Sequence, residues 1–511
     1  MNKPILIGAA ALSLASCAKS PEAKSLPNVI VILADDLGYG DMGAYGATGL
    51  STPNLDMLAN NGVRFTDGHA TSATSTPSRY ALFTGAYPWK NPRAKILAGD
   101  APLLIGTDQF TMPKMFRAAG YKTAAIGKWH LGMGDGKPDW NKPVVPGAND
   151  IGFDYSFLIA ATVDRVPTVY VEDCKVVGLD PNDPLEVSYT QNFGTQPTAI
   201  TNPELMTTLK WAHGHNNTVH NGIPRIGYMK GGNAARWVDE DMADCFVDKV
   251  KDYIEENKNE PFFLYYGLHQ PHVPRTPHSR FVGATTQGPR GDAIVEADWC
   301  VGELIAKLEK EGILENTIIF FSSDNGAVLN DGYIDGAAEL LGDHKPNGPF
   351  RGGKYSLFEG GTRVPFFIYW KGHIQPRVSD ALISQLDLLA SFAEIIDQPV
   401  PGGLDTENHL DLFMGKPGEG REDFIVEATG RMAFRKGGYA LVPPFTGEER
   451  NETGNELGIV KDFTLYDLKS DPTQMKDVTK AKPELLEQMK KEFISQTKGY
   501  YNPDTVVDAL Q

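Results

Sequence analysis

The chain has 511 residues, 41% of them hydrophobic and 22% charged, a globular composition long enough for a large core and a second domain. Its formal net charge of −17 argues against nucleic acid as a partner, because a phosphate backbone is bound by clustered positive charge. An anionic substrate would therefore need basic residues gathered in one pocket.

The first segment of the chain predicts export and is not expected to belong to the fold. An apolar stretch, residues 5–15, is too short to span a bilayer. The motif Leu14-Ala15-Ser16-Cys17 resembles the lipobox of bacterial lipoproteins, in which the cysteine is lipidated. We therefore expect a signal peptide at 1–16, a lipid on Cys17, a tether at 17–28, and a location in a Gram-negative cell envelope, periplasmic or anchored to the outer membrane. The alternative is an ordinary cleaved signal with a chance cysteine.

Apolar runs alternate with segments of helical spacing from Val29 to about Ile396. The strongest apolar runs are 28–33, 122–126, 261–268, 316–321 and 364–370, and helical spacing is clearest over 243–256 and 298–312. Such strands predict an α/β fold with a large mixed, mostly parallel sheet sandwiched by helices. The polar residues 170–235 indicate an insertion over one face of the sheet.

A second, smaller unit is expected at the C-terminus. Composition shifts to glycine and proline over 399–423, and short strand-like pieces follow. A last helix begins at Pro483, a residue favoured in the first turn. We predict a catalytic domain at 29–410 and an α+β subdomain at 411–511.

Three further cysteines lie within these domains. Cys174, Cys245 and Cys300 are an odd number without short spacing, which excludes zinc binding by CxxC pairs. Buried free thiols are expected, with at most one disulfide among them.

Polar side chains follow four of the apolar runs. Asp35-Asp36 follow the first, and Asp324-Asn325-Gly326 follow the run that ends at residue 321. The other two runs lead to Gly127-Lys128-Trp129-His130 and to His269-Gln270-Pro271-His272. Ligands of open α/β sheets bind beyond the carboxyl ends of the strands, so we expect these side chains to share one site.

Asp35, Asp36, Asp324 and Asn325 offer only oxygen ligands. Oxygen suits Ca²⁺ or Mg²⁺ and disfavours zinc. Each pair alone is more often a helix cap or a turn. Two such pairs at equivalent strand ends favour a metal site.

Basic and imidazole groups complete the expected site. Arg79, Lys128 and Lys354 are interpreted as clamps on a tetrahedral oxyanion, although each alone reads as a surface charge. His130 and His272 are the expected proton-transfer groups, since imidazole titrates near neutral pH. His269 is expected to be structural, and three histidines of a polar loop are interpreted as loop or substrate-rim residues: His213, His215 and His220.

Two motifs carry a resemblance to a known family. Ser75-Thr76-Pro77-Ser78-Arg79, followed by Leu82, Thr84 and Gly85, matches a signature with Cys or Ser first, then x-Pro-Ser-Arg-x-x-Leu-x-Thr-Gly. GKWHLG at 127–132 matches its second signature. The chain resembles the formylglycine-dependent sulfatases of the alkaline phosphatase superfamily over nearly all of its expected mature length.

The resemblance implies that Ser75 is a precursor, since a serine hydroxyl is a weak nucleophile. A radical-SAM maturase of the serine type would oxidise it to formylglycine (3-oxoalanine), whose hydrate attacks sulfur. The resemblance further implies Ca²⁺ as the metal and Lys354 beside the sulfate. Arg79 and Lys128 would hold the hydrate, His272 would protonate the leaving oxygen, and His130 would take a proton from the second hydroxyl.

The substrate is expected to be the 6-O-sulfate of a terminal galactose or N-acetylgalactosamine in a host mucin O-glycan or glycosaminoglycan, removed by an exo-acting enzyme. Asp164-Arg165 stand in an apolar stretch and resemble a pair that reads the axial O4 of such sugars in one branch of bacterial sulfatases. A structural ion pair is the simpler alternative for these two residues. Two other functions remain open: a phosphomonoesterase or phosphodiesterase of the same superfamily, and a glycan-binding surface lipoprotein with Ser75 unmodified.

Overall fold

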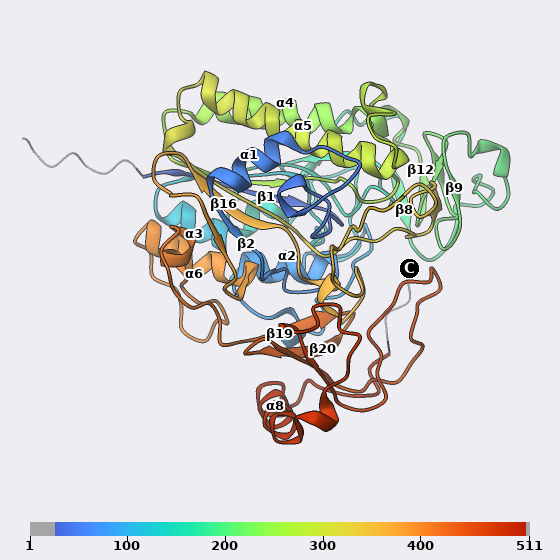
Figure 1. Ribbon diagram of the computed structural model, residues 1–511. Helices are drawn as coiled ribbons and strands as arrows, with labels where there is room; N and C mark the ends of the chain where they lie inside the picture. Colours follow the sequence, from blue (N-terminus) through green and yellow to red (C-terminus); the bar gives the residue numbers. More distant parts are fainter. Residues whose placement is uncertain (1–25, 507–511) are drawn as a thin grey trace, which may run out of the picture.

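A ten-stranded sheet forms the centre of the protein in the computed structural model, which describes residues 26–506 (Figure 1). The strand order is β17 (Arg377–Ser379), β2 (Val63–Phe65), β16 (Phe366–Trp370), β14 (Thr317–Ser323), β1 (Asn28–Ala34), β13 (Phe262–Gly267), β4 (Lys122–Lys128), β5 (Tyr155–Ile159), β6 (Tyr170–Glu172) and β7 (Lys175–Val176). The five strands from β14 to β5 are parallel, whereas β16, β6 and β7 run antiparallel to their neighbours. The predicted mixed, mostly parallel sheet is confirmed.

Helices cover both faces of this sheet, which explains why its strands are continuous apolar runs. Alternate residues of β1 belong to two different hydrophobic clusters, with Val31 in one and Ile32 in the other. In Figure 1, α1 (Pro53–Asn61), α4 (Met242–Asn257) and α5 (Gly288–Lys310) lie above the sheet. Below it lie α2 (Ser75–Thr84), α3 (Met112–Ala118) and α6 (Leu388–Ile395).

A smaller antiparallel sheet follows at the C-terminus, as predicted. It consists of β19 (Asp423–Ala428), β20 (Arg431–Lys436), β21 (Tyr439–Val442) and β22 (Thr464–Asp467). The last helix, α8 (Pro483–Gln496), buries Met489 and Phe493 in the core of this unit. The short α7 (Leu410–Phe413) still packs on the large core through Phe413, next to the domain boundary predicted at residue 410.

The polar insertion differs in part from its prediction. Residues 170–176 form β6 and β7 at the edge of the large sheet and do not lie over its face. Beyond them the insertion has only short strands: β8 (Glu186–Ser188) with β12 (Tyr228–Lys230), β10 (Val219–His220) with β11 (Ile223–Pro224), and β9 (Lys210–Trp211) with β15 (Tyr333–Ile334). A further pair, β3 (Gly68–His69) with β18 (Ile383–Ser384), lies near α2 and α6 in sequence.

The structure tests the prediction for the three cysteines but does not describe the predicted export segment. Among residues 26–506, Cys174, Cys245 and Cys300 are free thiols, but only Cys300 is buried and the other two are half-buried. The predicted signal peptide and Cys17 lie outside the described residues. Within the described residues, no helix combines the length and apolarity that a bilayer crossing needs.

A buried ion-pair network fastens the C-terminal sheet to the large domain. Arg435 of β20 contacts Glu359 at 2.7 Å and Asp67 at 3.1 Å. Asp67, His69 and Glu359 lie close enough to hold a metal ion, but the Arg435 guanidinium already pairs with this cluster. Although burial acts the other way, Arg435 holds the pKa of Asp67 well below its usual range.

Replacing this arginine should therefore destabilise the fold. Arg435→Leu removes the arginine nearest to Glu359 and Asp67 and leaves Arg363, at 3.2 and 3.5 Å, as their remaining arginine partner. Breaking this buried pairing costs about 3 kcal/mol. Chemical denaturation measures the effect, and Arg377→Leu, at an exposed position of edge strand β17, should stay within about 0.5 kcal/mol of wild type. Equal stability of the two variants would show that the network does not hold the units together.

Candidate active site

The carboxyl ends of four adjacent strands, β14, β1, β13 and β4, form one edge of the site. The backbone N–H of Asp35 donates to the carbonyl of Gln270 at 3.0 Å, and that of Asp324 donates to the carbonyl of Ala34 at 3.1 Å. These bonds hold the first residue after β1 and the first residue after β14 against the neighbouring chain segments. The polar side chains predicted at the strand ends therefore converge.

Ser75 begins α2 directly opposite these strand ends. Its side chain is buried, and its hydroxyl donates to Asp324 Oδ2 at 2.6 Å. Lys128 Nζ donates to Ser75 Oγ at 2.7 Å. A helix N-terminus presents backbone N–H groups that favour an anion, so this position suits a group that meets a negatively charged substrate.

Two fully buried cations face the carboxylates around Ser75. Lys128 Nζ lies 2.5 Å from Asp35 Oδ1, and Arg79 Nη2 lies 2.8 Å from Asp324 Oδ2. Although burial acts the other way, these cations hold the pKa of Asp324 below its usual range. Burial raises the pKa of Asp35 well above its usual value, and Lys128 offsets this only in part.

The oxygen atoms of this cluster fit a hard divalent cation. Asp35 Oδ2 and Asn325 Oδ1 are buried and accept no hydrogen bond from the described residues. Asn325 Nδ2 donates to Asp36 Oδ1 at 2.7 Å, which leaves its own oxygen available. Asp36 holds its carboxylate here from a left-handed backbone conformation, φ 63°. Three carboxylates and an amide oxygen are the ligands that Ca²⁺ prefers.

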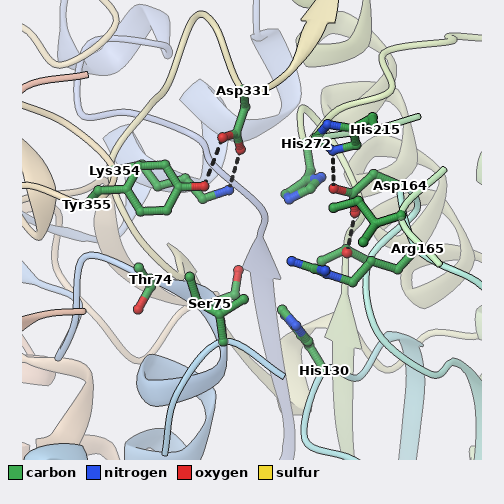
Figure 2. A pocket seen from close by; sticks show the side chains of 13 residues that line it. Thr74, Ser75, His130, Asp164, Arg165, His215, His272, Asp331, Lys354 and Tyr355 are labelled. Atoms are coloured by element: carbon green, nitrogen blue, oxygen red, sulfur yellow. Dashed lines mark hydrogen bonds and ion pairs between the residues drawn. The ribbon is translucent and has the colours of Figure 1, made fainter. Parts of the chain in front are cut away.

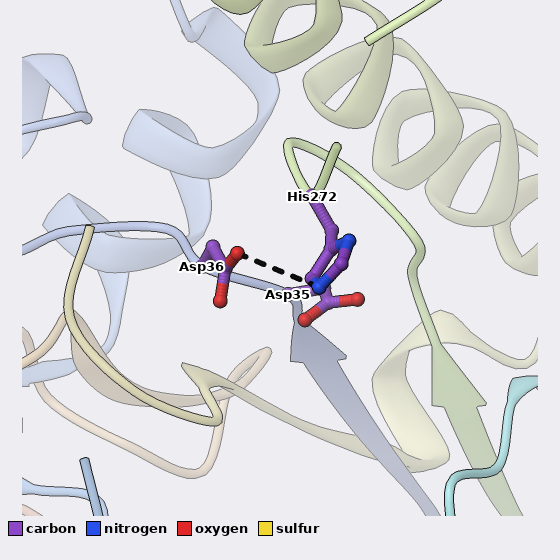
Figure 3. Close-up of side chains that lie close together, drawn as sticks. All are labelled: Asp35, Asp36 and His272. Atoms are coloured by element: carbon purple, nitrogen blue, oxygen red, sulfur yellow. Dashed lines mark ion pairs between the residues drawn. The ribbon is translucent and has the colours of Figure 1, made fainter. Parts of the chain in front are cut away.

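His272 borders the same cluster. Its Nε2 lies 3.8 Å from Asp36 Oδ2 (Figure 3), so an ion held by Asp35 and Asp36 would lie next to the imidazole. The Nδ1–H donates to the carbonyl of Val273 at 2.5 Å, which leaves the Nε2 lone pair toward the site. Burial, and then the charge of Lys354, hold the pKa of His272 well below its usual value.

His130 has a similar arrangement and also lines the pocket with Ser75. Its Nε2–H donates to the carbonyl of Leu97 at 3.0 Å, so Nδ1 carries the lone pair. No hydrogen bond reaches this Nδ1 from the part of the chain that the structure describes. Burial, and then the charge of Lys128, hold the pKa of His130 well below its usual value, which keeps the imidazole in its basic form.

Lys354 reaches the site from the loop that precedes β16. Its Nζ lies 2.9 Å from Asp36 Oδ2 and 2.8 Å from Asp331 Oδ2. Tyr355 donates its phenol to the other oxygen of Asp331 at 2.8 Å. Although burial acts the other way, Asp331 and Asp36 raise the pKa of Lys354 well above its usual value, so the ammonium stays charged.

These residues surround a small pocket (Figure 2). Ser75 and His130 line its lower side in the view, Lys354 and Asp331 one flank, and Asp164 and Arg165 the other. Its lining is Thr74, Ser75, Ile96, His130, Thr162, Asp164, Arg165, His215, Ile226, His272, Asp331, Lys354 and Tyr355.

Apart from Cys17, which lies outside the described residues, the predicted site residues lie in or directly beneath this pocket. Ser75, His130, Asp164, Arg165, His272 and Lys354 line it, and Asp35, Asp36, Arg79, Lys128, Asp324 and Asn325 are buried around Ser75. His269 packs near Phe246, outside the pocket lining. The catalytic and metal-binding roles of these residues remain predictions.

The sequence analysis missed part of the lining. Asp331 and Tyr355 were not singled out, because a lone Asp in a polar loop and a Tyr after a lysine give no signal. His215 was interpreted only as a loop or substrate-rim residue; it lines the pocket, and no sequence pattern indicated its pairing with Asp164, whose Oδ2 lies 2.8 Å from the His215 Nε2. His213 instead pairs with Glu452 at 2.6 Å.

Comparison with known proteins agrees with this geometry. Residues 27–397 match the family model described as Sulfatase. The chain is 48% identical over 469 residues to an N-acetylgalactosamine-6-O-sulfatase of Bacteroides thetaiotaomicron, covering 91% of each chain. It is 31% identical over 496 residues to bovine arylsulfatase A, covering 92% of this chain and 87% of the relative.

A solved structure gives the same result. A Bacteroides thetaiotaomicron protein, solved in work on the metabolism of multiple glycosaminoglycans, superposes with a TM-score of 0.91 at 47% identity, covering 92% of this chain and 99% of the other. The family model spans most of the chain and the relatives align over nearly all of it. The chain therefore belongs to the sulfatase family, whose members hydrolyse sulfuric esters.

Proposed function

We propose that the protein is an exo-acting carbohydrate sulfatase that removes the 6-O-sulfate of a terminal galactose or N-acetylgalactosamine from a host glycan, either a mucin O-glycan or a glycosaminoglycan. The observation that carries the proposal is the presence of Asp164 and Arg165 in the same pocket as Ser75. A carboxylate accepts from one sugar hydroxyl while a neighbouring guanidinium donates to the next. The relative of 48% identity is named for N-acetylgalactosamine 6-O-sulfate, which supports the same sugar class.

Ser75 would act after maturation to formylglycine by a radical-SAM maturase of the serine type. The signature around Ser75 supports this, and so does the absence of any histidine among the hydrogen-bond partners that the structure gives its hydroxyl. Its partners there are Asp35, Lys128 and Asp324. The hydrated aldehyde supplies the nucleophile that serine lacks. Lys128, 2.7 Å from Oγ, would hold the hydroxyls of the matured side chain.

Asp35, Asp36, Asp324 and Asn325 would hold Ca²⁺. The two buried oxygens without a donor, on Asp35 and Asn325, support this assignment. Burial of the site disfavours a bound sulfate anion. The ion, when bound, supplies positive charge that offsets this effect. Arg79, 2.8 Å from Asp324 Oδ2, would keep that carboxylate ionised and oriented.

Two histidines would move the protons. His272 Nε2 faces the pocket and would protonate the leaving sugar oxygen. An anionic substrate beside Lys354 offsets the charge of that ammonium, which favours protonated His272. His130 Nδ1, which carries the lone pair, would accept the proton from the second hydroxyl of residue 75 and so allow sulfate to leave. Lys354 would stay on the sulfate throughout.

Asp164→Ala tests the sugar assignment. Loss of a charged hydrogen-bond acceptor should lower kcat/KM by about 10- to 100-fold on 6-sulfated galactose and N-acetylgalactosamine. The rate on 6-sulfated N-acetylglucosamine, the C4 epimer, should change little, so the preference for galacto sugars shrinks. Asp180→Ala, an exposed acidic position in the insertion, serves as the matched control. A wild-type preference for the gluco sugar, or an unchanged ratio in Asp164→Ala, would remove the sugar assignment.

We further propose that the protein is a lipoprotein anchored through Cys17, since residues 14–17 resemble a lipobox. Ala18 is not the aspartate that often retains lipoproteins at the inner membrane, which favours the outer membrane. Cys17→Ser should move the protein from the membrane pellet to the soluble fraction of a Gram-negative host, whereas Cys174→Ser should not. Membrane partitioning that survives Cys17→Ser would assign the anchor to another part of the chain.

A further inference from the structure

His215 is a pocket residue whose position is fixed from two sides. Its side chain is buried, and its ring lies 4.4 Å from the ring of Tyr333, centroid to centroid. Nε2 lies 2.8 Å from Asp164 Oδ2, and Nδ1 lies 2.8 Å from the carbonyl oxygen of His213. Both partners are acceptors only, so a ring nitrogen that carries a proton donates to the partner it faces.

The carboxylate of Asp164 is held by two donors and keeps capacity for more. The Thr162 hydroxyl donates to Oδ1, and His215 donates to Oδ2. A carboxylate has about four lone-pair sites, so about two remain for a ligand. Figure 2 shows the bond between Asp164 and His215 beside Arg165, with the guanidinium directed toward the centre of the pocket. Thr162 and His215 together therefore restrict how the Asp164 carboxylate can rotate.

The His215 imidazole packs directly against the backbone of Gly332, where no side chain blocks it. Gly332 has a φ of +101°, and a Cβ at this position would lie 2.2 Å from His215 Nδ1. The backbone N–H of Ala212 donates to the Gly332 carbonyl at 2.7 Å, and Trp211 of β9 pairs with Tyr333 of β15. The insertion is thus fastened to the loop that carries Asp331, and His215 connects that flank of the pocket to Asp164.

We propose that His215 is a positioning residue for sugar recognition, which orients the Asp164 carboxylate toward a hydroxyl of the bound sugar. The inference rests on the proposed function, because it needs a sugar hydroxyl at Asp164. It adds a residue from the insertion, 51 positions from its partner, to the specificity of the enzyme. Gly332 contributes indirectly, since it leaves room for the imidazole.

The effect of His215 should be on binding and epimer preference, and not on the chemical step. In the matured enzyme, His215→Phe keeps a planar ring beside Tyr333 but removes the donor to Asp164. It should raise KM for 6-sulfated N-acetylgalactosamine about tenfold and lower the galacto-to-gluco preference by a similar factor, with kcat within about threefold. His215→Gln, which keeps an N–H donor, should recover most of the preference, and Gly332→Ala should reproduce the loss. Lys210→Gln, at an exposed position of β9, is the matched control.

Binding to unmatured protein gives a second readout. In a Ser75→Ala background, calorimetry compares the affinities for 6-sulfated N-acetylgalactosamine and N-acetylglucosamine with and without His215→Phe. If the Ser75→Ala parent shows no galacto preference, the proposed function has failed. If the parent prefers the galacto sugar and both His215→Phe and Gly332→Ala retain that preference while folded, the positioning role is overturned. A folded His215→Leu variant, which also lacks the donor to Asp164, decides the question where His215→Phe does not fold.

Discussion

Ser75→Ala is expected to lower the turnover of sulfated substrates on the order of 10⁴- to 10⁶-fold, as removal of a nucleophile does in other hydrolases. The substitution deletes only Oγ, and Lys128 and Asp324 still pair with each other at 3.3 Å, so the buried charges keep partners. Arg165, His272 and Lys354 still line the pocket. Substrate affinity, measured by calorimetry, should therefore stay within a few-fold of the unmatured wild type while turnover is lost.

The chemical state of residue 75 is measured directly by mass spectrometry. When the protein is produced beside a serine-type maturase, the tryptic peptide that ends at Arg79 should be lighter by the mass of H₂. Protein produced without the maturase should contain intact serine and be as inactive as Ser75→Ala. A fully active preparation that contains only intact serine at this position would contradict the formylglycine mechanism.

The sheet and the strand-end residues were predictable for the same physical reason. A parallel strand covered by helices on both faces must be apolar throughout, so β1 and β14 are visible as runs, and the first polar residue after each run marks its carboxyl end. Asp35 and Asp324 are therefore located by the ends of their strands. Ser75 and Lys128 were found because their motifs are short and contiguous in sequence.

Residues that reach the pocket through tertiary pairing could not be found in this way. His215 and Asp331 reach the pocket because β9 pairs with β15. This contact joins distant segments, and the sequence of neither two-residue strand predicts it. Residues 170–176 were assigned to the insertion because an edge strand needs few apolar residues, and in β6 only Val171 is buried. The Arg435 network joins side chains more than 300 positions apart, so no local pattern indicates it.

Asp324→Asn should abolish Ca²⁺ binding and lower activity by at least about 10³-fold. The substitution keeps the shape of the side chain but removes a negative charge from a buried cluster that contains Lys128 and Arg79, 3.3 and 2.8 Å from Asp324. These two cations are then less compensated, and repulsion between them and the metal ion opposes binding. Without the ion, the anionic transition state loses its principal counter-charge.

The metal content of purified protein and the calcium dependence of its rate test this assignment. Wild type should contain one Ca²⁺ per chain and lose activity on chelation, with recovery when Ca²⁺ is restored. Asp343→Asn, at an exposed position, should behave as wild type, and Asp324→Asn should contain no stoichiometric metal at any accessible Ca²⁺ concentration.

Lys128 and Arg79 flank Ser75 as well as Asp324, so Asp324→Asn alone does not separate a lost ion from displaced cations. Asn325→Leu separates the two effects, because it removes the buried oxygen that accepts no hydrogen bond but leaves the charge of the cluster unchanged. If Asn325→Leu binds Ca²⁺ as tightly as wild type, or if metal-stripped Asp324→Asn is fully active, this cluster is not the metal site.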